Sequence, residues 1–464
     1  MGKTEVLKEV LSKIRPDKEE RSQTELFVNE LIMIAKQVSK SYSTEPMIVG
    51  SYEKNTWLAG NNEIDLFILF NEAVSRKNLE EHGLEIAEKI TEQMNGTYVK
   101  KYSEHPYLCA TMKFQGMEFD VDIVPCYDIK ELKKIKSAVD RTPHHVRFVK
   151  KNLLLPDEAR LLKQFCKANG VYGADVKTNG FSGYLCELLV INYGKFENCI
   201  KDVATWRAPA VITLKEMDNK KLIATYKVPL IVIDPVDDNR NVAAAVSIEN
   251  FYKFIEAAKK FVDNPSVKLF FPDKTAPYTM EEITKEFSKR GTRWYAIKFD
   301  KPDAVDDILY PQMRRCISAI EKMLTEGGFK TMRKDFWIGD TCVIVFEMDT
   351  WMVPKVFKNI GPNVNSKHAD DFLKHYKEYK VFIDGENWVV EVERKYTTAL
   401  HLLKDLVSNT DVKLKEKGIP SKIVSNFKNA SVVSGSDMLK LIEKLPEDFR
   451  VFIRKWFDKD IDIV

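Results

Sequence analysis

Two short acidic patterns in the first third of the chain have the residue types and spacing to hold a divalent cation. Glu63 and Asp65 stand two residues apart at the start of an expected strand, so both side chains leave the same face of a sheet. In a later expected strand, Asp122 shares one face with Glu118 and Asp120. Three carboxylates from adjacent strands can hold two Mg²⁺ ions for in-line phosphoryl transfer. One ion would activate an attacking hydroxyl and the other would clamp a triphosphate.

A glycine-serine turn precedes the first acidic pattern. Gly50 and Ser51 directly follow an apolar strand, where backbone N–H groups and a hydroxyl can approach a phosphate closely. Acidic alternation by itself is most often the solvated face of a sheet, but the turn and the third acid favour the metal interpretation. Because Pro125 is expected to end the second acidic strand, Asp122 should lie near the sheet edge where Glu63 sits.

Alternating helices and strands must position these residues. The pattern predicts a mixed α+β protein with three parts: an α/β head over residues 1–141, a mainly helical neck over 142–277, and a C-terminal body over 278–464. The body is expected to hold a ferredoxin-like or RNA-recognition-like sheet and a helical tail. In the head we expect helices at 24–40 and 79–90 and strands at 47–50, 64–70, 98–102, 108–114 and 117–124, with a turn at Gln115-Gly116.

The neck and the body carry clear start and stop signals. Asp157 and Ser182 are expected to cap helices, and three prolines in 263–277 indicate a linker. Thr279 and Glu282 form a capping box at the start of the body. The other expected elements are strands at 228–233, 294–299 and 343–348, a loop at 234–240, helices at 308–324 and 370–379, and a hairpin around Asp384-Gly385.

Composition excludes several classes of protein. The 464 residues are 44% hydrophobic, and 72 basic against 69 acidic residues give a net charge of only +3, which excludes a disordered chain or a histone-like polycation. The seven cysteines contain no C-x-x-C pair, so we expect free thiols in a reducing compartment. The N-terminus lacks a secretory apolar segment, and no apolar stretch is long enough to span a bilayer. We therefore expect a cytoplasmic protein with no membrane partner.

Several long sequence blocks resemble one known family. In the first half of the head the acidic pattern lies within GSYEKNTWLAGNNEIDLFILF at 50–70, and VDIVPCY follows at 121–127. These blocks, with those named next, resemble the archaeal-type (class I) CCA-adding enzymes of the DNA-polymerase-β-like nucleotidyltransferase superfamily. The likeness covers about two-thirds of the chain with specific blocks and the rest more loosely. The further blocks are KSAVDRTPHH at 136–145, LLKQFCKANGVYGA at 161–174, GFSGYLCELL at 180–189 and DPVDDNRNVAA at 234–244.

The resemblance implies an enzyme that adds and repairs the 3′-terminal CCA of tRNA without a nucleic-acid template. It implies CTP and ATP as substrates, two Mg²⁺ ions as cofactors, and a polymerase-β-like head. Glu63, Asp65 and Asp122 match the family's catalytic, metal-binding carboxylates. Lys54 stands where the family often has arginine, and a lysine keeps the charge but loses the bidentate fork. The residues that match nucleotide contacts are Gly50, Ser51, Lys54, His145, Lys163, Tyr172 and Arg240.

Four of these residues have plainer interpretations on sequence alone. His145 has the position of a helix-capping residue after Pro143, and Lys163 has the pattern of a solvated helix lysine. Tyr172 could stack on a base or fill the core. Arg240 follows three aspartates and could be held in a structural ion pair.

Other functions stay open at this stage. A poly(A) polymerase or an oligoadenylate synthetase would share the carboxylates but use ATP alone, so CTP incorporation separates them. A catalytically inactive RNA-binding protein is the alternative of another class, although it has no reason to gather three acids where RNA phosphates pass. As partners we expect the acceptor and TΨC stems and the 3′ end of tRNA, recognised by shape and phosphates. A homodimer is left open.

Overall fold

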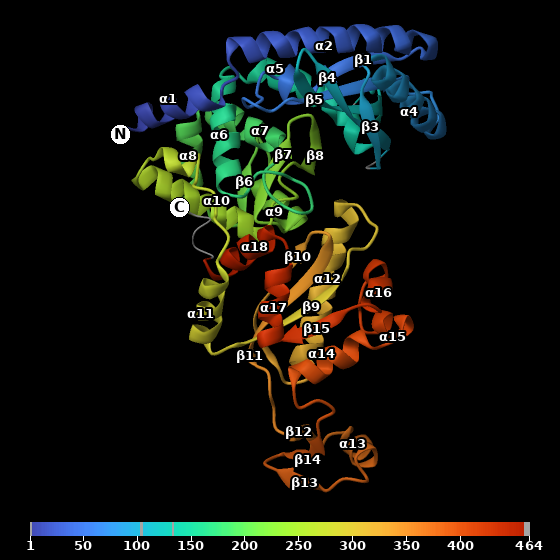
Figure 1. Cartoon of the computed structure of the whole chain (residues 1–464), viewed down its shortest axis with the longest axis vertical. Helices are drawn as coiled ribbons and strands as arrows, with labels where there is room; N and C mark the ends of the chain where they lie inside the picture. The colour runs from blue at the N-terminus through green and yellow to red at the C-terminus, as the bar shows by residue number, and fades with distance from the viewer. Residues whose placement is uncertain (1, 103–104, 132–133, 459–464) are drawn as a thin grey trace. The chain divides into compact units, whose positions relative to one another are not determined.

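The computed structural model describes residues 2–102, 105–131 and 134–458. It divides into two compact units, with the boundary between Asp273 and Lys274 (Figure 1). Each unit is described below by itself. Within the described ranges, no helix has both the length and the apolar character that a bilayer span requires.

A five-stranded sheet with the order β1-β2-β5-β4-β3 forms the first part of unit one. The strands β2 and β5 run parallel, and the other neighbours are antiparallel. Helices α2 and α4 cover one face, where their apolar side chains form a core with those of the strands. The elements are α1 (Lys3–Ile14), α2 (Lys18–Ser39), β1 (Glu45–Val49), α3 (Gly50–Glu53), β2 (Glu63–Phe70), α4 (Arg76–Gln93), β3 (Thr97–Tyr102), β4 (Pro106–Phe114) and β5 (Met117–Tyr127).

Two sequence predictions about this sheet, one for a turn and one for a strand end, have different outcomes. Gln115 and Gly116 have φ angles of 48° and 83°, which confirms the predicted tight turn between β4 and β5. The prediction that Pro125 ends its strand is wrong, because β5 continues to Tyr127 with Pro125 paired opposite Ile68 of β2. The pairing is parallel, and Pro125 is itself buried between the partly buried Val124 and the buried Cys126.

Helices dominate the second part of unit one. Ser182 accepts a hydrogen bond from the Leu185 N–H and caps α7 as predicted. Asp157 does not cap α6; the N-cap is Leu155, and Asp157 lies in the first turn, bonded to arginines. The expected loop at 234–240 contains a strand, β8. The elements are α5 (Thr142–Asn152), α6 (Pro156–Ala168), α7 (Gly183–Tyr193), α8 (Phe196–Val203), β6 (Ala210–Ile212), α9 (Asn219–Tyr226), β7 (Leu230–Asp234), β8 (Asp237–Asn241) and α10 (Ile248–Asp263).

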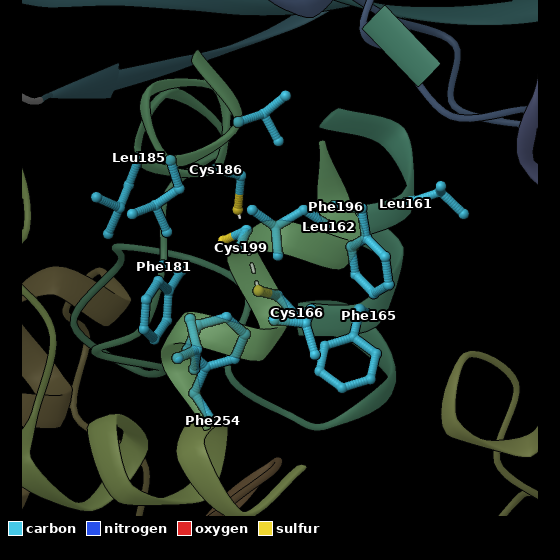
Figure 2. Packing of buried hydrophobic residues seen from close by; sticks show 14 of the residues in the cluster. Leu161, Leu162, Phe165, Cys166, Phe181, Leu185, Cys186, Phe196, Cys199 and Phe254 are labelled. Carbon is cyan, nitrogen blue, oxygen red and sulfur yellow. Dashed lines mark hydrogen bonds between the residues drawn. The ribbon is translucent and has the colours of Figure 1, made fainter. Parts of the chain in front are cut away.

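The core between α6, α7 and α8 is rich in phenylalanine and sulfur. Figure 2 shows Cys166, Cys186 and Cys199 turned toward one another beside Phe165. The Sγ atoms of Cys166 and Cys186 lie 4.0 Å apart, and all seven cysteines are free thiols, as predicted. Burial raises the pKa of Cys166 and Cys199 above the ordinary thiol range, so these sulfurs act as apolar filler. This packing fixes the helices that carry two functional side chains described below.

Unit two contains a four-stranded antiparallel sheet with the order β10-β11-β9-β15. With helix α12 after β9 and helices α14–α16 before β15, this is the predicted ferredoxin-like arrangement. The predicted capping box at Thr279 and Glu282 is confirmed at the start of α11. The elements are α11 (Met280–Arg290), β9 (Arg293–Asp300), α12 (Asp306–Glu326), β10 (Lys330–Ile338), β11 (Thr341–Thr350), α14 (Ala399–Val407), α15 (Asp411–Glu416), α16 (Ser421–Phe427), β15 (Ser431–Ser434), α17 (Ser436–Lys444) and α18 (Glu447–Phe457).

A second, three-stranded sheet is inserted between β11 and α14, with the order β12-β14-β13. The hairpin predicted at Asp384-Gly385 is confirmed, and Gly385 has a φ of 60° that suits the turn. Its elements are β12 (Val356–Asn363), α13 (Ala369–His375), β13 (Val381–Asp384) and β14 (Asn387–Glu393).

Candidate active site

The acidic residues lie on the sheet face opposite α2 and α4. Asp65 of β2 is paired with Asp122 of β5, and Glu63 is paired with Asp120, two residues earlier on each strand. The alternate residues, such as Ile64 and its neighbours on both strands, are buried in the core beneath the helices. The two strands therefore bring the predicted carboxylates onto one face. Asp122 lies opposite Asp65 and not opposite Glu63, a register that the sequence does not reveal.

Asp65 is the most strongly perturbed carboxyl of this group. Burial and repulsion from Asp122 raise its pKa to about 6, although Lys54 acts in the opposite direction. Gly50 at the start of α3 has a φ of 69°, and a Cβ there would lie only 1.7 Å from Asp65 Oδ2. Glycine is therefore required at this position because the turn passes directly over the carboxylate. Asp65 and Asp122 thus form a crowded acidic pair that a cation would relieve.

The third acid lies apart from that pair. Glu63 is exposed, and Asn61 Nδ2 donates to Glu63 Oε2 at 3.2 Å. Asp122 Oδ1 accepts from the Cys109 thiol at 2.6 Å, since Cys109 of β4 is its register partner on the other side. Across residues 2–102, 105–131 and 134–458, no three His, Cys, Asp or Glu side chains converge as a ready-made metal group. The donor chemistry fits Mg²⁺, and the shared face supplies the proximity.

A buried network joins two of the predicted lysines. Lys163 Nζ lies 2.8 Å from Glu187 Oε1 and 2.8 Å from Thr56 Oγ1, while Lys54 Nζ lies 2.6 Å from Glu187 Oε2. Lys163 is only 3% exposed, so the solvated-lysine interpretation is wrong. Burial by itself raises the pKa of Glu187, but the positive charges of Lys163 and Lys54 outweigh this effect and lower the pKa from 4.5 to about 2. One carboxylate therefore holds two ammonium groups beside Asp65.

Glu187 and Thr56 are site residues that the sequence analysis missed. Glu187 is a single acid in the apolar run Leu185–Leu189 of α7, and it is completely buried. A lone charge inside an apolar helix must have a partner, and that was the signal available in the sequence. Thr56 lies in the loop after α3, and its N–H donates to the Ser51 carbonyl at 2.8 Å. This bond ties the loop to the glycine-serine turn.

Tyr172 lies close to the Lys163 side of the network. A Cβ placed on Gly183, the first residue of α7, would lie 3.0 Å from the Tyr172 hydroxyl and 3.5 Å from Lys163 Nζ. Burial raises the pKa of Tyr172, so the hydroxyl stays protonated and can donate. The residue bridges to Phe181 through its backbone and is half-buried, so the ring is neither fully in the core nor free.

His145 and Arg240 meet at a second buried carboxylate. Asp234 is fully buried at the end of β7, and its Oδ2 lies 2.8 Å from both His145 Nε2 and Arg240 Nη1. The Tyr184 hydroxyl donates to Asp234 Oδ1 at 3.0 Å, and its ring stacks on His145 at 4.0 Å. Burial lowers the pKa of His145, whereas hydrogen bonds from His145 and Arg240 bring that of Asp234 to about 2 despite its burial.

This cluster decides between the alternatives left open for both residues. His145 is not a helix cap, because α5 begins at Thr142 and its N-cap is Arg141. Arg240 does form an ion pair, with Asp234, yet its side chain remains 37% exposed and can still contact a ligand. Tyr184 and Asp234 were missed as site residues, and Lys54 Nζ lies 5.8 Å from the Tyr184 ring centre, beside the first network. All the predicted site residues lie in unit one.

Comparison with known proteins adds three matches to protein-family models. Residues 30–145 match the nucleotidyltransferase domain, residues 157–271 the second domain of tRNA nucleotidyltransferase, and residues 290–431 the C-terminal domain of the CCA-adding enzyme. The first match covers the sheet with the acidic face. The second covers the helices that carry Lys163 and Glu187, and the two strands that carry Asp234 and Arg240.

Curated relatives match along most of the chain. The CCA-adding enzyme of Methanosarcina acetivorans is 36% identical over 457 residues, covering 96% of this chain and 97% of the relative. That of Methanocaldococcus jannaschii is 39% identical over 443 residues, covering 92% and 95%. That of Archaeoglobus fulgidus is 38% identical over 397 residues, covering 85% and 87%.

Proposed function

This chain belongs to the CCA-adding enzymes, and from that premise we propose how its residues add the terminal CCA to tRNA. The enzyme is a nucleotidyltransferase, a family that uses nucleoside triphosphates and a divalent metal. We propose CTP and ATP as the substrates, with the RNA 3′-hydroxyl attacking the α-phosphate in line and pyrophosphate leaving. The observation that carries the function is the identity of 35–39% to CCA-adding enzymes along most of the chain.

The direct test is incorporation of label into tRNA that lacks its terminal CCA. With both α-labelled CTP and α-labelled ATP present, we expect two C residues and then one A to be added. A protein that adds only A would be a poly(A)-type enzyme instead. A protein that binds the RNA but adds nothing would be an inactive binding module.

Glu63, Asp65 and Asp122 are proposed to hold two Mg²⁺ ions on the acidic face. The crowding of Asp65 and Asp122 supports this, because burial and repulsion from Asp122 raise the pKa of Asp65 even with Lys54 and Lys163 nearby. When bound, the ions polarise the attacking hydroxyl and neutralise the triphosphate. The chain itself keeps the acids adjacent through the β2–β5 register, and Gly50 lets the phosphate-binding turn approach them.

The nucleotide contacts are proposed around the loop that links α3 to β2. Ser51 and the N–H groups at the start of α3 would bind phosphate, with Gly50 providing the close approach. Lys54 supplies a positive charge there, and Tyr172 supplies a protonated hydroxyl next to Lys163. Glu187 is a positioning residue, because it fixes both ammonium groups in place before the nucleotide arrives.

Replacing Lys163 by Ala is expected to raise the KM for CTP and ATP alike, by on the order of 10- to 100-fold for one charge-assisted contact. The KM for tRNA should change little, because the residue lies in the nucleotide part of the site. Steady-state kinetics with each substrate varied in turn measure this. Lys167→Ala, an exposed lysine on the same helix, is the matched control. KM values for both nucleotides that are unchanged from the wild type would contradict a nucleotide contact and leave Lys163 with a structural role only.

His145 and Arg240 are proposed to contact the nucleotide and the RNA end, with Asp234 and Tyr184 positioning them. Asp234 accepts from both residues, so the outward-facing donors of Arg240 and the remaining ring nitrogen of His145 have a fixed direction. The lowered pKa of His145 favours a neutral ring at pH 7. Base choice would then come from the partly exposed Arg240 guanidinium together with the RNA end itself.

We propose three functional domains: a catalytic head at 1–141, a neck at 142–277 that completes the nucleotide site, and a tRNA-binding body and tail at 278–464. The last six residues of the third domain lie outside the described residues. The two compact units meet in the sequence between Asp273 and Lys274, close to the start of the body, and this supports the boundary between neck and body. A cytoplasmic location, where tRNA is repaired, and a homodimer are also proposed.

A minihelix with only the acceptor and TΨC stems should be extended nearly as well as full tRNA. An enzyme without a template must identify its substrate by overall form, and A-form RNA offers phosphates and 2′-hydroxyls more readily than base edges. Binding should therefore weaken steeply with salt, as counterion release requires. Rates on the two RNAs and affinities at several salt concentrations test this. Much slower extension of the minihelix would place recognition elsewhere on the tRNA.

A further inference from the structure

An arginine-lined hollow lies next to the loop that carries Lys54 and Thr56, with Asn55 of that loop in its lining. Its volume is about 290 Å³, and it belongs wholly to unit one. The residues come from the end of α1, the start of α2, the loop after α3 and the first turns of α6. Its lining consists of Arg15, Arg21, Asn55, Pro156, Asp157 and Arg160.

Positive charge exceeds negative charge in this hollow. Asp157 is the only acid in the lining, and it is shared: its Oδ1 lies 3.1 Å from Arg15 Nε and 2.8 Å from Arg160 Nη1. Three guanidinium groups against one carboxylate leave a formal charge of +2. Arg160 is 1% exposed, and burial together with repulsion from Arg21 and Arg15 lowers its pKa to about 10. The cluster is therefore short of an anion.

Donors remain available on the two outer arginines. Arg21 uses Nε for the Pro16 carbonyl and Nη1 for Asn55 Oδ1 at 3.0 Å, and its guanidinium lies 4.7 Å from the Trp57 ring centre. Among the described residues, no acceptor lies within hydrogen-bond distance of Arg21 Nη2 or Arg15 Nη1. Two planar guanidinium forks at one opening are suited to the oxygens of a phosphate group.

The hollow is connected to the nucleotide site through Asn55. This residue has a φ of 53°, and its Oδ1 accepts from both Arg21 and Arg160. Its two neighbours in the chain, Lys54 and Thr56, donate hydrogen bonds to Glu187. We propose that the hollow binds a phosphate group, from the RNA backbone or from free phosphate, and thereby orders the loop that presents Lys54.

Inorganic phosphate is the first probe, added to the full-length protein with saturating CTP and Mg²⁺ so that the proposed triphosphate site is filled. The melting temperature is compared with that in chloride of equal ionic strength. We expect phosphate to stabilise the wild type. Arg21→Ala and Arg15→Ala should each weaken phosphate binding roughly tenfold, whereas Asp157→Asn should tighten it. Arg207→Ala, an exposed arginine elsewhere in the unit, is the control. A variant that merely disturbed the structure would weaken phosphate binding. The tighter phosphate binding expected for Asp157→Asn therefore distinguishes anion binding from a loss of structure.

Minihelix binding at several salt concentrations then distinguishes the two sources of phosphate. If the RNA backbone supplies the group, Arg21→Ala should reduce the salt slope by about one unit. An unchanged slope with lost phosphate stabilisation assigns the hollow to free phosphate. Arg21→Gln, which removes the charge but keeps a long polar side chain, replaces Arg21→Ala if that variant does not fold. Equal phosphate stabilisation of wild type, Arg15→Ala, Arg21→Ala and Asp157→Asn overturns the proposal, whether or not CCA is still added to tRNA.

Discussion

Asp122→Asn should abolish both C addition and A addition while leaving tRNA affinity within about twofold of the wild type. The change removes one negative charge from the crowded pair with Asp65 but keeps the size of the side chain, so β5 should fold unchanged. Losing a metal ligand removes charge neutralisation in the transition state, which appears in kcat and not in RNA binding. Single-turnover incorporation of labelled CTP and ATP, with a separate RNA binding assay, measures the two effects.

Asp120→Asn is the matched control for this prediction. Asp120 lies two residues earlier on the same strand and the same face, but it is exposed and accepts from Thr111 Oγ1 at 3.0 Å. Its variant should retain most of the activity. Full activity of Asp122→Asn with both nucleotides would contradict the metal assignment. Loss of C addition alone, or of A addition alone, would indicate two separate sites for the two nucleotides.

The acidic face was predictable because it follows from a local rule. Strand side chains alternate with a period of two, so Glu63 and Asp65 must share a face, as must Asp120 and Asp122. Which pairs lie opposite depends on the register between strands distant in sequence, and only the structure shows that Asp65 meets Asp122. Pro125 was misread for a related reason, since a strand end was inferred from one residue without its neighbours.

Helices and strands with strong periodicity were also predictable, whereas polar strands were not. The long helix after β9 and the hairpin at Asp384-Gly385 have clear apolar spacing and turn residues. Strand β10 carries Arg333, Lys334 and Asp335 in its middle, and this reads as a loop in a single sequence. It is held by pairing with β11, a non-local cause that no window of sequence contains.

The buried charge networks were the least predictable part of the site. Lys163 has the sequence pattern of an exposed lysine, and its partner Glu187 lies 24 positions away on another helix. Asp234 belongs to an apolar strand, and its three partners come from α5, α7 and β8. A charged residue within an apolar run of sequence indicates such a buried side chain, but its partners can be identified only from the packing of the folded chain.

Glu187→Gln should combine a large loss of stability with a loss of nucleotide affinity. Removing the carboxylate charge leaves Lys163 buried without its main partner, which typically lowers the free energy of unfolding by about 3–5 kcal/mol. Because Lys54 also loses its anchor, the KM for both CTP and ATP should rise together. Chemical denaturation and steady-state kinetics measure the two effects. Thr56→Val, which loses only the bridging hydroxyl, should show smaller effects in the same direction.

The pH dependence of that stability loss provides an independent check. The folded pKa of Glu187 is lowered to about 2 from an ordinary value of 4.5, so its stabilising contribution is complete above pH 4.5 and is lost as the pH falls toward 2. The difference in unfolding free energy between wild type and Glu187→Gln should therefore shrink over this window. Glu249→Gln, a surface glutamate in an i,i+4 pair, should show almost no difference at any pH. A gap between wild type and Glu187→Gln that stays constant from pH 4.5 to 2 would mean that the carboxylate is not held by the two lysines.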